Sequence, residues 1–140
     1  INRQSVSLQL TRENYTRQIA PARTFGFLRD VDSLRNMGLI RGGSLENALV
    51  LTDTGLMNRT GLRFADEFCR HKLLDLIGDL ALIGRPILGH VIAERAGHYM
   101  HVALVHRLMH DRSLWEEVEL EEPPLRLAPL AASAALTASD

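Results

Sequence analysis

Apolar and polar positions follow two different periods along this chain. Residues 5–10 read SVSLQL, in which every second side chain is apolar, and this pattern predicts a half-buried strand. Residues 47–51 (NALVL) and 86–93 (PILGHVIA) contain the aliphatic and β-branched residues of strands, and residues 23–27 should also be extended. We therefore expect several short strands.

Helical spacing occupies much of the remaining sequence. Residues 64–82 keep apolar side chains near helical spacing, and they should form the longest helix and the spine of the domain. Shorter helices are predicted over residues 12–19, 30–37 and 97–109, and Thr11 can cap the first of them. The mixture of periods argues against an all-helical or an all-strand domain.

The character of the sequence changes after Asp111. Five glutamates lead into Pro123-Pro124 and then into a low-complexity Leu/Ala/Ser stretch. We expect residues 111–140 to be a mobile tail, or one bound only to a partner. Residues 1–110 should form one domain, because a chain of 140 residues with 46% hydrophobic residues can bury a core of ordinary size.

The overall charge excludes some partners. With 16 Lys+Arg against 17 Asp+Glu, the chain has no electrostatic footprint for nucleic acid or for an anionic membrane.

No apolar run has the length of about 18 residues that a transmembrane segment needs. The single Cys69 cannot form an internal disulfide, which favours a cytoplasmic location. The chain begins with Ile1, which suggests a fragment or a processed product.

Candidate chemistry is concentrated on the predicted long helix. His71, Asp75 and Asp79 follow one another at intervals of four residues and share a face, each turned by about 40° from the last. Two acids beside the apolar stripe are costly to bury without a cation or a donor. A histidine and an aspartate one turn apart can bind one zinc ion. Taken alone, however, the spacing favours an ordinary surface ion pair.

Other histidines follow on the predicted last helix. His98 lies at its start and could act as a general acid, with Asp79 holding its tautomer. A histidine satisfied by backbone groups at a helix start is the simpler interpretation of the pattern alone. The spacings of His98 with His101 and of His106 with His110 also suit a metal, but we interpret these as structural or surface groups.

Five strings, taken together, identify a family. They are APARTFGF at 20–27, GGSLENA at 42–48, DEFCRHKLLD at 66–75, IGDL at 77–80 and GH at 97–98. In order and interval they closely resemble the second domain of UDP-3-O-acyl-N-acetylglucosamine deacetylase, over roughly residues 3–109. The resemblance implies an α+β fold, a two-layer sandwich of helices on a small mixed β-sheet, with a βαβ insert at about residues 27–52.

The resemblance also implies roles for the candidate residues. It makes His71 and Asp75 two of three zinc ligands, and His98 the acid that protonates the leaving amine or stabilises the oxyanion. Asp79 would be the partner of His98. The hydroxyl of Thr24 would hydrogen-bond the substrate carbonyl.

Substrate contacts follow from the same resemblance. Phe25 would pack near the sugar, and Lys72 would meet the diphosphate of the UDP-linked substrate. The βαβ insert would form a hydrophobic passage for the fatty acyl chain. Its expected lining is Val31, Ile40, Ser44, Ala48 and Val50.

The implied activity is zinc-dependent hydrolysis of the N-acetyl group of UDP-3-O-(3-hydroxyacyl)-N-acetylglucosamine, the committed step of lipid A biosynthesis. In the family, the third zinc ligand and the general base come from the N-terminal half of the enzyme. No matching Glu-His motif precedes the five strings in this chain. We therefore expect the chain alone to be inactive and to need that half as a partner.

Two other functions are compatible with parts of the sequence. A noncatalytic module would keep the passage as an acyl-chain-binding or partner-binding surface, but such a module needs none of the predicted site residues. Another zinc hydrolase could act on a different amide, but a small substrate needs no passage. One departure from the family is the segment Tyr99-Met100-His101-Val102, which stands where the family has a pair of asparagines. His101 offers an extra nitrogen there, although we expect it to be exposed.

Overall fold

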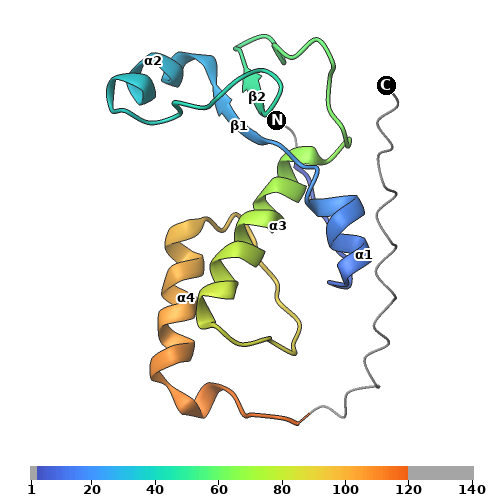
Figure 1. Ribbon diagram of the computed structural model, residues 1–140, viewed down its shortest axis with the longest axis vertical. Coiled ribbons are helices and arrows are strands. Elements are labelled where there is room, and N and C mark those ends of the chain that lie inside the picture. Colours follow the sequence, from blue (N-terminus) through green and yellow to red (C-terminus); the bar gives the residue numbers. More distant parts are fainter. Residues whose placement is uncertain (1–2, 120–140) are drawn as a thin grey trace, which may run out of the picture.

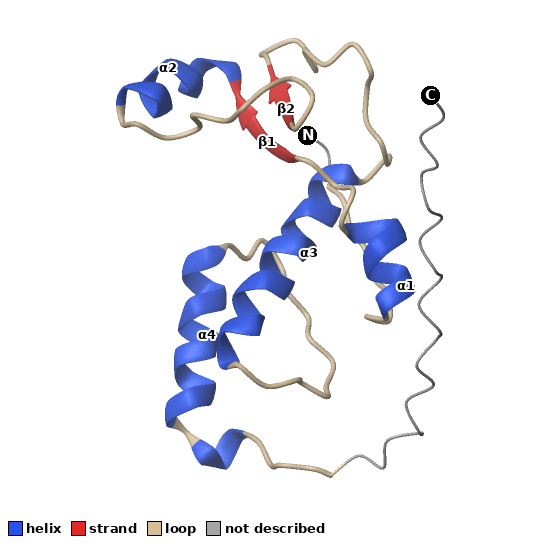
Figure 2. Cartoon of the chain, viewed as in Figure 1, coloured by secondary structure: helices blue, strands red, loops and turns tan. Residues whose placement is uncertain are grey.

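The computed structural model of the chain describes residues 3–119. Figure 2 shows a mostly helical arrangement with one small sheet, so the predicted α+β class is confirmed. The elements, in chain order, are α1 (Arg12–Asn14), η1 (Tyr15–Ile19), β1 (Thr24–Phe27), α2 (Leu28–Asn36), β2 (Ala48–Leu51), α3 (Glu67–Leu80), η2 (Ala81–Ile83), α4 (His98–His110) and η3 (Arg112–Leu114).

The sheet consists of β1 and β2, which run parallel with Thr24 opposite Ala48 and Phe27 opposite Leu51. Helix α2 connects them, because parallel neighbours need a crossover, and the three elements form a βαβ unit. This unit lies at one end of α3 (Figure 1). Within residues 3–119 the sheet is therefore parallel and two-stranded, and the expectation of a mixed sheet is wrong for this part of the chain.

Two of the predicted strands, residues 5–10 and 86–93, are not strands in this structure. The alternation in the first segment is still visible, because Val6 and Leu8 are partly buried whereas Ser5 is exposed. An alternating pattern reports which side of an extended segment is buried, whereas a strand also needs a neighbour for its backbone hydrogen bonds. Neither segment has such a neighbour within the described residues.

The helices agree more closely with the sequence. The hydroxyl of Thr11 accepts a hydrogen bond from the backbone N–H of Asn14 at 3.1 Å, so the first predicted cap is confirmed. Helix α2 begins at Leu28 and not at Asp30, because β1 runs directly into it, and Asp30 lies in its first turn instead. An acid in the first turn still interacts favourably with the helix dipole.

Helix α3 is the spine of the molecule, as predicted, and continues through η2 to Gly84. Gly84 has a φ of 74°, the left-handed conformation with which glycine commonly ends a helix. Helix α4 lies alongside α3 in Figure 1, and β1 and η1 also contact α3. The buried apolar side chains are Ile19, Ala22, Leu49, Phe68, Leu76 and Val105.

One side of α3 borders an open groove of about 1000 Å³. Residues 6–10 line one part of the groove and residues 84–87 another, and the apolar side chains of Leu73, Leu76 and Ile77 contribute from α3. Within residues 3–119, no helix combines the length and the apolar character that crossing a bilayer requires.

The predicted tail begins with described residues. Residues 112–114 form η3, and the indole N–H of Trp115 donates to the carbonyl oxygen of Leu108 in α4 at 2.6 Å. Residues 115–119 have no regular structure. The rest of the predicted tail, residues 120–140, lies outside the described residues.

Candidate active site

A buried ion pair anchors the start of α3. The carboxylate of Glu67 has no exposed surface, and it accepts the Nε–H of Arg23 at 2.8 Å and the Nη2–H of Arg23 at 3.0 Å. The backbone N–H groups of Arg23 and Arg63 donate to it as well. Burial alone would raise the pKa of Glu67, but these hydrogen bonds lower it to about 2. The pair holds the chain just before Thr24 against α3.

This pair was not predicted from the sequence. Arg23 lies inside one of the family strings, and Glu67 lies 44 residues later inside another. The signal that could have found it is Arg23 alone, a charged residue among mostly apolar neighbours in the string APARTFGF. A buried charge needs a partner, but the sequence alone does not say which one.

His71 and Asp75 share one face of α3. The Nδ1 of His71 lies 3.2 Å from the carbonyl oxygen of Ala22, and because a carbonyl only accepts, Nδ1 carries a proton, which in the neutral imidazole leaves the lone pair on Nε2. That Nε2 lies 3.4 Å from Oδ1 of Asp75, and both side chains are less than one-fifth exposed. An outer hydrogen bond at Nδ1 is typical of histidines that bind zinc through Nε2.

Lys72 and Phe25 border the same face. The Nζ of Lys72 contacts Oδ2 of Asp75 at 2.5 Å, so its amine lies at the predicted metal ligands. The ring of Phe25 lies edge-on to the ring of Phe68, with centroids 5.0 Å apart, and edge-on to the imidazole of His71 at 6.3 Å. Phe25 therefore forms one wall beside His71.

Thr24 precedes Phe25 in β1, and its side chain is exposed. The residues on both sides of it are tied to α3, since Arg23 pairs with Glu67 and Phe25 packs on Phe68. The backbone position of Thr24 is therefore held by the contacts of its neighbours.

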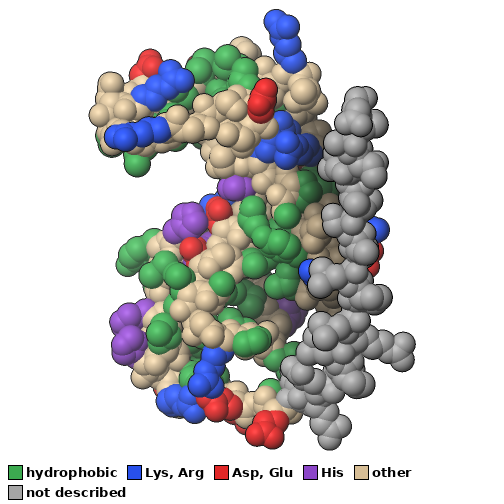
Figure 3. All heavy atoms as spheres, in the orientation of Figure 1, with side chains coloured by type: hydrophobic (Ala, Val, Ile, Leu, Met, Phe, Trp, Pro, Cys, Tyr) green, Lys and Arg blue, Asp and Glu red, His purple; other side chains and the backbone are tan. Residues whose placement is uncertain are grey.

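His98 and Asp79 meet where α4 begins. The Nδ1 of His98 lies 2.7 Å from Oδ2 of Asp79, and its Nε2 lies 3.9 Å from Oδ2 of Asp75. The two predicted zinc ligands, His71 and Asp75, thus lie close to the predicted acid His98 and its partner Asp79. Figure 3 shows histidine and acidic side chains gathered in the middle of this face, where the βαβ unit meets the helices.

The expectation that His101 is exposed is wrong, because its side chain is only 3% exposed. His101 lies one turn after His98 on α4, on the side that packs against α3. Its Nδ1 contacts Oδ2 of Asp79 at 2.8 Å, the same oxygen that His98 contacts. The sequence analysis did not include His101 among the site residues.

The carboxylate of Asp79 is stabilised by these two imidazoles. Burial would raise the pKa of Asp79, but the hydrogen bonds from His101 and His98 bring it below its usual value. Within residues 3–119, Asp79, His98 and His101 also form a group whose potential metal-binding atoms lie within 4.8 Å of one another. The two short N–H···O contacts account for that proximity.

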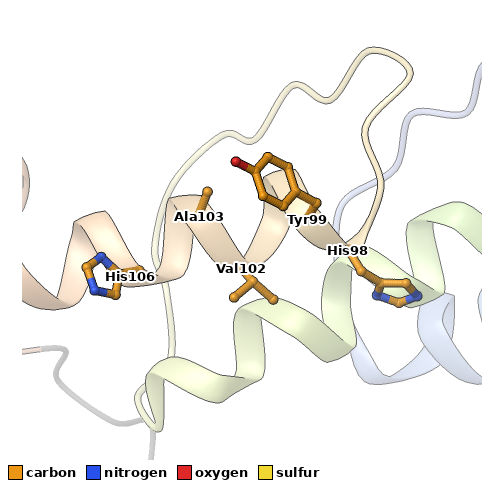
Figure 4. A pocket seen from close by; sticks show the side chains of 5 residues that line it. All are labelled: His98, Tyr99, Val102, Ala103 and His106. Atoms are coloured by element: carbon orange, nitrogen blue, oxygen red, sulfur yellow. The ribbon is translucent and has the colours of Figure 1, made fainter.

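A shallow apolar pocket of about 570 Å³ lies beside His98 on the outer side of α4. In Figure 4, His98 points toward α3 from the start of α4, whereas Tyr99 points away from α3. The residues that line the pocket are His98, Tyr99, Val102, Ala103 and His106.

The five residues expected to line an acyl-chain passage belong to the βαβ unit. Val31 is in α2, Ile40 and Ser44 are in the connection to β2, and Ala48 and Val50 are in β2. Ile40 and Ser44 are exposed, and the other three are partly buried.

Comparison with known proteins assigns the chain to a family. Residues 1–110 match the profile of a family described as LpxC, UDP-3-O-acyl N-acetylglycosamine deacetylase. The chain belongs to this family. The matched segment includes every residue of the site described above.

Curated members of the LpxC family are similar over most of the chain. A UDP-3-O-acyl-N-acetylglucosamine deacetylase of Solibacter usitatus is 59% identical over 122 residues, which are 87% of this chain and 41% of that protein. Proteins described in the same words from Myxococcus xanthus and Acidithiobacillus ferrooxidans are 52% and 44% identical, over 84% and 97% of this chain and 38% and 44% of their own lengths. The chain therefore spans about 40% of the length of these LpxC relatives.

Proposed function

We propose that this chain supplies half of the active site of a zinc-dependent deacetylase that acts on UDP-3-O-(3-hydroxyacyl)-N-acetylglucosamine, the committed step of lipid A biosynthesis. The observation that carries the proposal is the position of His71 Nε2, 3.4 Å from Oδ1 of Asp75, with His98 facing the same carboxylate from the next helix. Family membership and relatives described as this deacetylase support it.

The donor set fits zinc. Imidazole nitrogen and carboxylate oxygen are ordinary zinc ligands, and the bond from His71 Nδ1 to Ala22 leaves Nε2 free to bind. When bound, zinc supplies a Lewis acid that polarises the amide carbonyl and makes water acidic enough to act near pH 7. Catalytic zinc sites usually take three protein ligands. We propose that the third ligand and the general base come from the N-terminal half of the enzyme.

His98 is suited to handle the proton of the reaction. Asp79 accepts the Nδ1–H of His98, which leaves Nε2 as the atom that exchanges protons with the substrate. This atom faces Asp75, so it lies on the side where the scissile amide would approach the proposed zinc ligands. A protonated His98 can donate to the departing amine, and the Thr24 hydroxyl can donate to the carbonyl oxygen as negative charge develops there.

The βαβ unit suits an acyl chain. Several large apolar side chains of this unit are exposed, although apolar surface is costly to leave in water. They are Leu28, Met37, Leu39, Ile40 and Leu45. Phe25 would face the sugar, and Lys72 would leave Asp75 to meet the diphosphate. We propose the cytoplasm as the location of this reaction, on the strength of the single Cys69.

A noncatalytic acyl-binding or partner-binding module is the second candidate, and the same exposed apolar side chains favour it. Such a module has no use for the hydrogen bond from His71 to Ala22 or for the pairing of His98 with Asp79. The deacetylase therefore accounts for more of the observed contacts.

The test uses a chimera in which this chain replaces the matching segment of the Solibacter usitatus deacetylase. Acetate release is measured from the acylated UDP-sugar and from UDP-N-acetylglucosamine without the acyl chain. We expect turnover of the acylated substrate and at least tenfold lower kcat/KM for the other, because remote apolar binding energy contributes to the transition state. Zinc-loaded, folded chimera without turnover would favour the noncatalytic module.

A further inference from the structure

We propose that His101 is a positioning residue. It holds the carboxylate of Asp79 in the orientation in which this carboxylate accepts a hydrogen bond from His98. The Nδ1 of His101 and the Nδ1 of His98 lie 2.8 Å and 2.7 Å from the same atom, Oδ2 of Asp79. One carboxylate oxygen has lone pairs for two donors, so both imidazoles can donate at once. The catalytic consequence rests on the proposed function of His98, whereas the geometric claim does not.

The two imidazoles differ in how far they are buried. The side chain of His98 is 65% exposed, whereas that of His101 is 3% exposed. Water can compete with the exposed donor, but it cannot replace the buried one without leaving a polar group unsatisfied. The bond from His101 therefore determines where the carboxylate of Asp79 lies, and His98 adapts to it.

The helices give His101 a rigid base. Its backbone N–H donates to the carbonyl of Gly97 at 3.1 Å in the first turn of α4, and Val105 is buried one turn later on the same helix. Asp79 lies one residue before the end of α3, where a carboxylate has no favourable interaction with the helix dipole. Donors from α4 therefore hold a side chain that α3 itself does little to stabilise.

A structural role in packing is the competing interpretation, and it predicts different behaviour of variants. His101→Asn keeps an N–H near the position of Nδ1, because the asparagine amide lies at the same distance along the side chain. His101→Gln moves the amide further out, toward the position of Nε2, and His101→Leu keeps bulk but has no donor. Val105→Ala is the matched control, since it removes buried apolar volume on the same face of α4 without touching Asp79.

The first readout is the tautomer of His98, measured by nitrogen-15 NMR of imidazole groups in the 140-residue chain at one alkaline pH. We expect His98 to carry its proton on Nδ1 in the wild type, in His101→Asn and in Val105→Ala. In His101→Gln and His101→Leu we expect a mixture of both tautomers, because Asp79 is no longer held. A single Nδ1–H tautomer in either of these variants would overturn the proposal, so the measurement still decides if one of them does not fold.

The second readout is turnover by the chimera. We expect His101→Gln to lower kcat about tenfold or more, with KM and zinc content unchanged, since outer partners of a site typically contribute this much. His101→Asn should be close to wild type. Equal loss in His101→Asn and His101→Gln would overturn the positioning role. Absence of turnover in the wild-type chimera would instead count against the proposed function, and the imidazole spectra would still decide on His101.

Discussion

Glu67 and Asp79 lie near opposite ends of α3, and each holds another part of the chain against it. Glu67 pairs with Arg23, which precedes Thr24, and Asp79 accepts from the imidazole of His98. The pKa of each carboxyl lies below its usual value, because hydrogen bonds outweigh the effect of burial. Two acidic side chains on one helix thus place residues of β1 and α4 beside the proposed zinc ligands.

The Glu67 pair should make stability depend on pH. In the folded chain its pKa is about 2, against 4.5 for an ordinary glutamate. A lowered folded pKa means that the contribution is fully present above pH 4.5 and is lost as the pH falls through about 2. We expect Glu67→Gln to lower the free energy of unfolding at neutral pH by about 3 kcal/mol, because it leaves Arg23 buried without its anion.

Urea unfolding at several pH values measures this contribution. The exposed Glu46 supplies the control, and Glu46→Gln should change the free energy of unfolding little. If Glu67→Gln and Glu46→Gln have the same pH dependence as the wild type between pH 7 and the acid transition, the buried pair does not contribute as described.

At the scale of elements, the sequence predicted the helices better than the strands, because helices depend on local signals. The cap at Thr11, the left-handed Gly84 and the apolar spacing of α3 are properties of neighbouring residues, and the helices follow them closely. The predicted strands at 5–10 and 86–93 are wrong because strand formation depends on a partner distant in sequence. The sequence placed His71 and Asp75 on one face and paired His98 with Asp79, but for the same reason it did not reveal the contacts of Arg23 with Glu67 and of His101 with Asp79.

Hydrogen exchange tests this difference between elements. We expect the backbone amides of α3 to be well protected, because they donate within a helix that packs against α4. The amides of residues 5–10 should exchange at rates near those of an unstructured chain, since they have no ladder partner within residues 3–119. Protection of alternate amides in residues 5–10 at the level of α3 would show that this segment pairs as a strand.

At the scale of the whole molecule, the proposed site is divided between two helices and contains two of the three protein ligands that a catalytic zinc site usually has. Helix α3 contributes His71 and Asp75, and α4 contributes His98. The chain spans about 40% of the length of its curated relatives, which leaves most of each relative to supply a third ligand and a base. In the proposed function, therefore, α3 would hold the metal and the first turn of α4 would supply the proton.

Zinc content and initial rate of acetate release, measured on the same samples of the chimera, test this separation most directly. The wild type should contain about one zinc per molecule and turn over the acylated UDP-sugar. His71→Ala should lose both zinc and turnover, whereas His98→Ala should keep its zinc and lose about 10²- to 10⁴-fold in kcat. Full zinc in His71→Ala, or an unchanged kcat in His98→Ala, would contradict the account.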